Sequence, residues 1–209
     1  MTSFYDETVK CSVCGQDSEQ YGLMSTNAFG SPDLDTRPPE MKRSTMDFWL
    51  QECPHCGYVA SSLEKAINCE IGYLSSSEYK DFPASSPVSE LAQRFVKKAR
   101  IAAKGEDYLE AFWGYLHAAW ASDDEEDETW QIELRKSAIQ MMEKFNDEEM
   151  ADNYRLIRVD LLRKTRQFER LLQEYENMRF EDELFNQILR FQILKAKDKD
   201  TATYTVIET

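Results

Sequence analysis

The chain has 209 residues, of which 42% are hydrophobic and 12% aromatic. This composition excludes a wholly disordered protein, and no apolar run approaches the roughly 18 residues that a membrane-spanning helix needs, so we expect no membrane association. The formal net charge is -14, from 25 Lys and Arg against 39 Asp and Glu. A chain this acidic is repelled by the phosphate backbone of nucleic acids unless a local basic patch intervenes.

The first residues, MTSFYDETVK, lack the basic start and the apolar stretch of an export signal. We therefore expect a cytoplasmic protein with reduced cysteines, because disulfides are rare in the cytosol. Thiolates are then available as metal ligands.

Two C-x-x-C pairs, each followed at once by glycine, lie in the N-terminal part of the chain. They are CSVCG, with Cys11 and Cys14, and CPHCG, with Cys53 and Cys56. A zinc knuckle turns tightly around its metal, and glycine tolerates the positive φ that such a turn demands. Four thiolates complete the tetrahedral shell of one structural Zn²⁺ and leave no position open for a substrate. We predict such a zinc ion here; free or buried thiols and a thioredoxin-like redox pair are the alternatives.

The other sulfur and imidazole groups nearby are poorer candidates for this metal. A segment of 38 residues, from Gly15 to Glu52, separates the two knuckles, so the site must be assembled from two distant hairpins. His55 lies inside the second knuckle, between two better ligands, and we expect it to be exposed. Cys69 has no partner two residues away, and we expect it to pack as a small apolar side chain.

The segment between the knuckles changes character along its length. Pro38 and Pro39 exclude a regular helix in its first half, which is rich in turn-forming residues. From Met46 onward, the sequence MDFWLQE fits a ribbon strand that enters the second knuckle. The basic side chains of the segment are Arg37, Lys42 and Arg43. They bind either an external peptide or phosphate, or the neighbouring acids Asp33, Asp35 and Glu40.

The region after the ribbon shows the signals of a short helix and a linker. A capping box from Ser61 to Glu64 predicts the short helix. The Ser- and Pro-rich residues 75–87 form the linker, which ends with Ser86 as N-cap and Pro87 at the first helical position. We therefore divide the chain into a zinc-ribbon domain at 1–74, the linker at 75–87, a helical domain at 88–199 and a tail at 200–209.

Apolar residues recur at helical spacing from the linker to about Lys197 and predict six helices in three antiparallel pairs. In ARIAAKGEDYLEAFWGYLHAAW, small and aromatic residues fall where a tetratricopeptide (TPR) repeat places them. These residues are Ala99, Gly105, Tyr108, Ala111, Tyr115 and Ala118. RKTRQFERLLQEYENM repeats the pattern imperfectly, with Leu171 where a small residue belongs. The predicted fold is mainly α with a small β zinc ribbon, and its helices form TPR-like hairpins or, alternatively, a plain bundle.

Charged residues gather at several places in the helical part. The acidic run DDEEDE, residues 123–128, fits a favourable interaction with the following helix N-terminus better than a calcium site. Two basic stretches could face one groove and there bind an acidic peptide tail or a phosphate; otherwise they are solvated helix faces paired with neighbouring acids. The basic residues that we assign to this groove are Arg94, Lys98, Arg155 and Arg158.

Three stretches, LDTRPPEMKRSTMDFW, ECPHCGYVA and GEDYLEAFWGYLHAAW, together resemble a family of uncharacterised bacterial cytosolic proteins. Its members look like a split zinc ribbon of two C-x-x-C pairs followed by TPR-like helices. The most specific parts of the resemblance are the four paired cysteines and the segment Arg37–Glu40. The resemblance implies a zinc site and a scaffold fold, and it implies no reaction.

The sequence favours a non-catalytic protein-interaction module, in which zinc fixes the ribbon and the helices present a groove to a protein partner. Candidate aromatic anchors for that partner are Trp113, Trp120 and Trp130. A nucleic-acid-associated zinc ribbon is the alternative, but the net charge and the lack of an aromatic-and-basic strand disfavour it. An unidentified hydrolase ranks third, because neither His55 nor His117 has a recognisable Cys or Ser with an acid nearby. The sequence is also compatible with a homo-oligomer.

Overall fold

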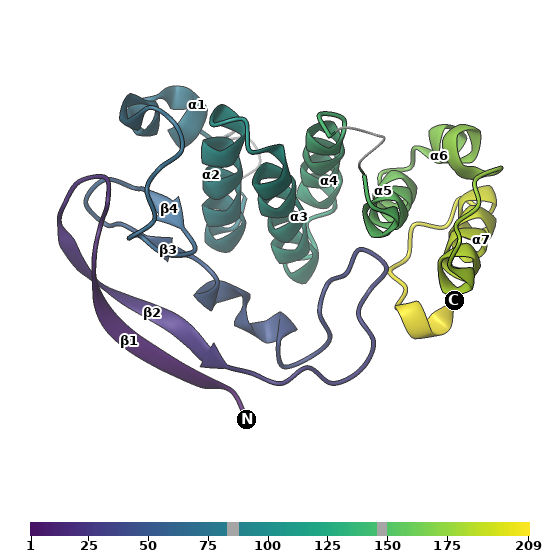
Figure 1. Ribbon diagram of the computed structural model, residues 1–209, viewed down its shortest axis with the longest axis horizontal. Helices are drawn as coiled ribbons and strands as arrows, with labels where there is room; N and C mark the ends of the chain where they lie inside the picture. The colour runs from purple at the N-terminus through teal and green to yellow at the C-terminus, as the bar shows by residue number, and fades with distance from the viewer. Residues whose placement is uncertain (83–87, 146–149) are drawn as a thin grey trace.

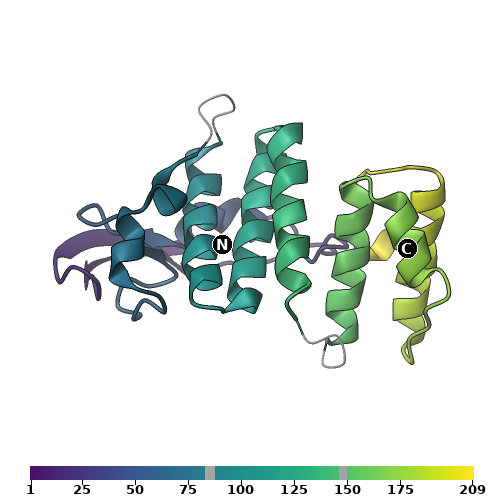
Figure 2. The ribbon, with the colours of Figure 1, turned by 90° about the horizontal axis from the view of Figure 1, so that it is seen from above.

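The computed structural model describes residues 1–82, 88–145 and 150–209. Within these residues, two pairs of antiparallel strands lie at one end, and six helices of eight or more residues follow in a row (Figure 1). Seen from above, these helices stand side by side (Figure 2). The expected fold class, mainly α with a small β part beside the cysteines, is confirmed.

The strand pairs are two hairpins whose turns carry the cysteines. β1 (Ser3–Lys10) pairs with β2 (Asp17–Ser25), and the turn between them holds Cys11 and Cys14. β3 (Gln51–Glu52) pairs with β4 (Val59–Ala60) around Cys53 and Cys56. The two knuckles therefore come from separate hairpins, as their spacing in the sequence predicted.

Polar side chains cap most of the long helices. The Ser89 hydroxyl accepts the N–H of Ala92 at the start of α2, and an aspartate plays the same part at the starts of α3, α4 and α7. Ser86 and Pro87, which we expected at the start of α2, lie outside the described residues. The bounds are α1 (Ser77–Lys80), α2 (Glu90–Lys104), α3 (Tyr108–Asp124), α4 (Glu128–Met142), α5 (Asp152–Lys164), α6 (Phe168–Tyr175) and α7 (Glu183–Lys197).

Small residues let α2 and α3 approach each other closely. A Cβ atom added to Gly114 would lie 2.7 Å from the Cβ of Ala99, closer than real Cβ atoms come. Ala99 and Ala111 are fully buried. Since the distance between packed helices depends on the side chains at their contact, small residues at these positions set the separation of the pair.

The residues between β2 and β3, here called the insert (26–50), pack against the helices. Leu34, Met46 and Leu50 of the insert belong to the same buried apolar core as the helices. The insert runs along one side of the helical row toward the C-terminal residues (Figure 1). There the N–H of Leu34 donates to the carbonyl of Tyr204 at 2.9 Å, and the N–H of Val206 donates to Pro32 at 2.9 Å. Residues of the C-terminal tail are thus held against the insert.

The short helix expected at Ser61–Glu64 is wrong, because tertiary contacts take the backbone groups that a helix would use. Residues 61–65 form turns and bends. The N–H of the buried Leu63 donates to the Gln51 side chain at 2.9 Å, and its carbonyl accepts the N–H of Ser12 at 2.9 Å. Local propensity yields here to the packing of the two hairpins.

The ribbon strand expected from Met46 is also wrong for most of its length. Arg43–Phe48 form a 3₁₀ helix, and β3 begins only at Gln51. The hydroxyl of Thr45 donates to the carbonyl of Lys42 at 2.7 Å and accepts the indole N–H of Trp49 at 2.9 Å. These local bonds stabilise a helical turn, since Ser and Thr hydroxyls compete with other backbone pairings.

Candidate metal centre and adjoining cavity

Four cysteines form a cluster with the dimensions of a metal site. The sulfurs of Cys11, Cys14, Cys53 and Cys56 all lie within 4.8 Å of one another. The distance from Cys11 Sγ to Cys56 Sγ is 3.8 Å, and that from Cys14 Sγ to Cys53 Sγ is 3.6 Å. Four sulfurs placed tetrahedrally around zinc at the usual Zn–S length would stand about 3.8 Å apart. The donor set and its spacing therefore fit a zinc-ribbon-like site, and these four cysteines could bind one metal ion.

The two knuckles have the same backbone geometry. Gly15 has φ +73° and Gly57 has φ +74°, in the left-handed region that glycine tolerates. The N–H of each glycine donates to the carbonyl of the first cysteine of its pair, Cys11 or Cys53, at 2.9 Å. The glycine that follows each C-x-x-C pair is thus required by the turn, as we predicted.

The surroundings of the Cys56 sulfur disfavour its thiolate form in the absence of a cation. Burial raises the pKa of the Cys56 thiol, as do its hydrogen bonds with the other three sulfurs, while the backbone N–H of Tyr58 lowers it. A divalent cation held by the four sulfurs would favour the charged form. His55 is exposed, as expected, and Cys69 is partly buried beside the cluster without belonging to it.

The metal centre is fastened to the helical row through a second, smaller core. The hydroxyl of the buried Tyr79, in α1, donates to the carbonyl of Gly57 at 2.6 Å. The Tyr58 hydroxyl donates to the carbonyl of Lys65 at 2.9 Å. Ile101 of α2 packs into this core with Cys11 and Cys53. The position of the knuckles is therefore fixed relative to α2.

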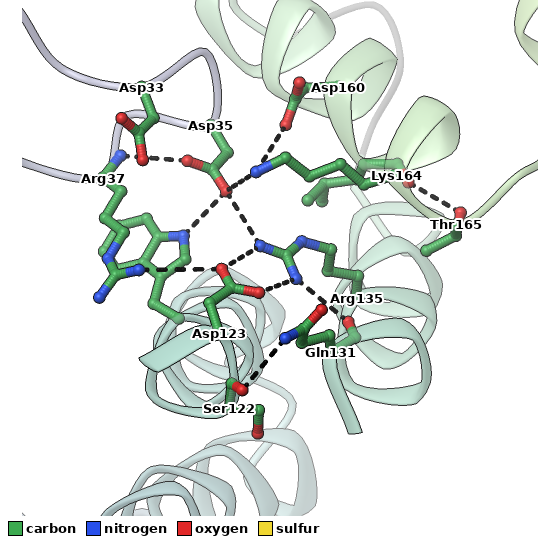
Figure 3. A network of polar contacts seen from close by, with 12 residues as sticks. Asp33, Asp35, Arg37, Ser122, Asp123, Gln131, Arg135, Asp160, Lys164 and Thr165 are labelled. Atoms are coloured by element: carbon green, nitrogen blue, oxygen red, sulfur yellow. Dashed lines mark hydrogen bonds and ion pairs between the residues drawn. The ribbon is translucent and has the colours of Figure 1, made fainter. Parts of the chain in front are cut away.

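A network of buried charges joins the insert to three helices (Figure 3). Asp35 is fully buried, and its Oδ2 lies 3.5 Å from Lys164 Nζ, 3.5 Å from Arg135 Nη2 and 2.9 Å from the Trp120 indole nitrogen. Burial raises the pKa of Asp35, but Lys164 and Arg135, with hydrogen bonds from Trp120 and the Arg37 backbone, outweigh it and hold the pKa below its usual value. Asp35 is therefore an anion enclosed by cations from α4 and α5.

The turn that carries Asp35 is strained. Thr36 has φ 67°, which a β-branched residue rarely adopts. The N–H of Thr36 donates to Asp33 at 2.8 Å, and the N–H of Arg37 donates to the Asp35 carboxylate at 3.2 Å. Such strain persists only where surrounding contacts fix it, as the buried network does here.

Two of the three basic residues of the insert, Arg37 and Arg43, form ion pairs within the chain. Arg43 binds Asp33 at 2.8 Å, which confirms the expected local tether. Arg37 instead reaches α3, where it binds Asp124 at 2.5 Å. The Arg37 side chain is buried, whereas the Asp124 side chain is 55% exposed, so solvent screens the pair from one side. The local tether expected for the Arg37 side chain is therefore wrong, and this side chain attaches the insert to the end of α3, where the acidic run begins.

The acidic run 123–128 is divided among structural contacts. Asp123 binds Arg135 through both carboxylate oxygens, at 2.8 Å and 2.6 Å. Asp127 caps α4 by accepting the N–H of Trp130. Glu128 pairs with Arg166. The expected role of this run at a helix N-terminus is confirmed for Asp127, and Figure 3 shows Asp123 within the buried network.

A cavity of about 640 Å³ lies between the β1–β2 hairpin, the insert and α3. Its size falls within the range of small-molecule and peptide sites. The residues that line it are Tyr5, Leu23, Thr36, Pro38, Lys42, Phe48, Trp49, Ser61, Trp113, His117 and Trp120. Sequence reasoning gave only Trp113 and Trp120 of this set as candidate anchors, and the third, Trp130, packs partly buried against the main core.

Aromatic rings surround His117 at one wall of the cavity. The ring centroids of Trp120, Trp49 and Trp113 lie 4.7, 5.3 and 5.7 Å from that of His117, and Phe95 is at 5.3 Å. Burial lowers the pKa of His117 to about 3, with a smaller contribution from Lys98. The imidazole is consequently neutral at physiological pH, and the side chain is partly buried.

The four basic residues assigned to a groove lie on two helices that α3 and α4 separate (Figure 1). On α2, Arg94 donates to the carbonyl of Leu50, and Lys98 binds Glu110 at 2.8 Å. On α5, Arg158 binds Glu174 at 2.5 Å, and Arg155 donates to a backbone carbonyl at 3.2 Å. Each of the four thus has a partner within its own chain.

No protein-family model, curated protein or solved structure matches the chain significantly. Among the described residues, no helix has both the length and the apolar character needed to cross a bilayer.

Proposed function

We propose that this chain is a zinc-stabilised protein-interaction module that binds a segment of a partner protein in the cavity between the hairpin, the insert and α3. The cavity itself is the observation that carries the proposal. Its walls come from three parts of the chain, and three tryptophans contribute to them. Tryptophan is enriched among the residues that supply most of the binding energy at protein interfaces.

Zinc has a structural part in this proposal. The ribbon residues would hold it through Cys11, Cys14, Cys53 and Cys56. When bound, the ion supplies folding free energy on the order of 10 kcal/mol to hairpins that bury little apolar surface by themselves. Four sulfur ligands leave it no open position for a substrate. The helices are proposed to act as TPR-like hairpins, which the close approach of α2 and α3 at Gly114 supports.

The lining of the cavity favours binding over catalysis. Among the described residues that form it, His117 is accompanied by hydroxyl groups but by no carboxylate or thiol. A histidine base ordinarily needs a group that orients it beside the nucleophile. We therefore infer a non-catalytic site.

The test is selection of binding peptides from a random displayed library with the zinc-loaded full chain. Peptides that bind the wild type should bind Trp113→Ala at least about tenfold more weakly. A buried tryptophan anchor contributes about 2 kcal/mol or more to the free energy of binding. Tyr21→Ala is the matched control, since Tyr21 is an exposed aromatic residue of β2 outside the cavity. Peptides that depend on Tyr21 and not on Trp113 would move the site to the outer face of the hairpin and contradict the proposal.

A further inference from the structure

Five polar groups that line the cavity have no hydrogen-bond or ion-pair partner among the described residues. Three neighbouring groups serve as a contrast: the indole N–H of Trp120 and of Trp49 and the hydroxyl of Ser61 are each engaged within the chain. The five that remain without a partner are the Tyr5 hydroxyl, the Thr36 hydroxyl, the Lys42 ammonium, the Trp113 indole N–H and the His117 imidazole.

All five groups can donate a hydrogen bond, and two of them can do nothing else. The Lys42 ammonium and the Trp113 N–H have no acceptor capacity. The two hydroxyls and the neutral imidazole can also donate. A ligand rich in acceptors, as carboxylates and carbonyls are, would complement this set, in which Tyr5, Thr36 and Lys42 are exposed to solvent.

The charge of the lining points to the same class of ligand. Lys42 is the only charged residue among the described residues that line the cavity. The chain as a whole carries -14, so a wall without carboxylates differs from the average surface of this protein. Asp35, which lies behind the wall at Trp120, is neutralised by Lys164 and Arg135. The local field in the cavity therefore favours a negative group beside Lys42.

The remaining walls are apolar and mostly aromatic: Leu23, Pro38, Phe48, Trp49 and Trp120. The faces of these residues suit an apolar or aromatic side chain, which gains most when it is buried between rings. We propose that the cavity binds an acidic peptide segment of a partner protein, in which an apolar side chain enters between the tryptophans and an adjacent carboxylate meets Lys42. This inference rests on the proposed function and names the chemistry of its partner.

The test uses three labelled peptide libraries and the zinc-loaded full chain. The libraries share randomised apolar positions around a central phenylalanine, and they carry Asp, Asn or Lys on both sides of it. Fluorescence anisotropy should show that the Asp library binds at least about tenfold more tightly than the Asn library, because a hydrogen bond between two charged groups is stronger than one to a neutral amide. The Lys library should bind more weakly still.

Charge reversal separates the local contact from the overall charge. Lys42→Glu should reverse the preference between the Asp and Lys libraries. Lys10→Glu changes the net charge equally at an exposed position of β1 outside the cavity, and it should leave the preference unchanged. Equal weakening by both variants would assign the effect to net charge and overturn the inference.

Other outcomes distinguish this inference from the proposed function. Equal binding of all three libraries that Trp113→Ala abolishes would refute the acidic ligand and leave the cavity as a peptide site. Absence of binding by all three libraries would also refute the acidic ligand. The peptides selected from the random displayed library would still decide the proposed function. Displacement of the Asp library by a single-stranded RNA, with steep salt dependence, would assign the cavity to nucleic acid and overturn both.

Discussion

Replacing Asp35 with alanine should lower the free energy of unfolding by about 3–5 kcal/mol, the range for breaking a buried ion pair. The remaining contacts limit the loss, because Lys164 keeps Asp160 at 3.7 Å and Arg135 keeps a second carboxylate at 2.6 Å. The substitution also leaves the buried indole N–H of Trp120 without its acceptor, which costs about 1–3 kcal/mol. The free energy lost from the weakened ion pair and the cost of the unsatisfied Trp120 N–H together stay within about 3–5 kcal/mol.

Urea unfolding, followed by far-ultraviolet circular dichroism, measures this loss. Asp47→Ala is the matched control, because Asp47 is an exposed aspartate of the same insert, and it should change the free energy of unfolding by less than about 0.5 kcal/mol. The double variant Asp35→Ala/Lys164→Met should be less destabilised than the sum of the single variants, since it removes a cation that has lost a partner. Equal stability of Asp35→Ala and Asp47→Ala would refute the view that the buried network fixes the insert.

Three further predictions concern the metal, the histidine and the helix contact. Cys53→Ser should abolish stoichiometric zinc, measured by elemental analysis, and unfold the ribbon while helical circular dichroism is largely kept; Cys69→Ser should retain the metal. The free energy of unfolding should fall by about 2 kcal/mol between pH 7 and pH 5 on account of His117. The pKa of His117 is lowered to about 3 in the folded chain, so only the unfolded chain takes up a proton on this residue in that range. Denaturant unfolding at a series of pH values should show a smaller pH dependence for His117→Phe. Gly114→Ala should cost about 1–3 kcal/mol by overpacking against α2, whereas Gly72→Ala, with open space around it, should cost less in the same urea assay.

The knuckles were predictable because their signal is local. A cysteine pair and the glycine after it fix both the donor atoms and the backbone turn within five residues, and Gly15 and Gly57 adopt the expected φ. The sequence left open free or buried thiols and a redox pair as alternatives, and the sulfur distances show that the two hairpins meet as predicted. The helices were predictable for a similar reason, because apolar spacing acts within a few residues, whereas the cap at Asp107 was not predicted.

The buried network could not be predicted because its partners are distant in sequence and its residues have the composition of a surface. Asp35 and Lys164 are separated by 129 positions. A charged residue in a loop that is rich in Pro and Gly predicts exposure, since charged residues are seldom fully buried unless they are paired. The one local indication was the segment Arg37–Glu40, which resembled a family-specific motif without showing what it contacts. The cavity was missed for the same reason, as its walls come from three distant parts of the chain.

The cysteine cluster and the buried network both support the cavity, and the network reaches its wall through Trp120. Five lining residues, from Thr36 to Trp49, belong to the insert. The segment that contains the insert is held at its two ends by Cys14 and Cys53, and in its middle by Asp35 and Arg37. A segment of this length would lose much conformational entropy if peptide binding had to order it, and the fixed points remove that cost before the ligand arrives. On the proposed function, the cysteine cluster and the buried charges would both preorganise the cavity for its ligand.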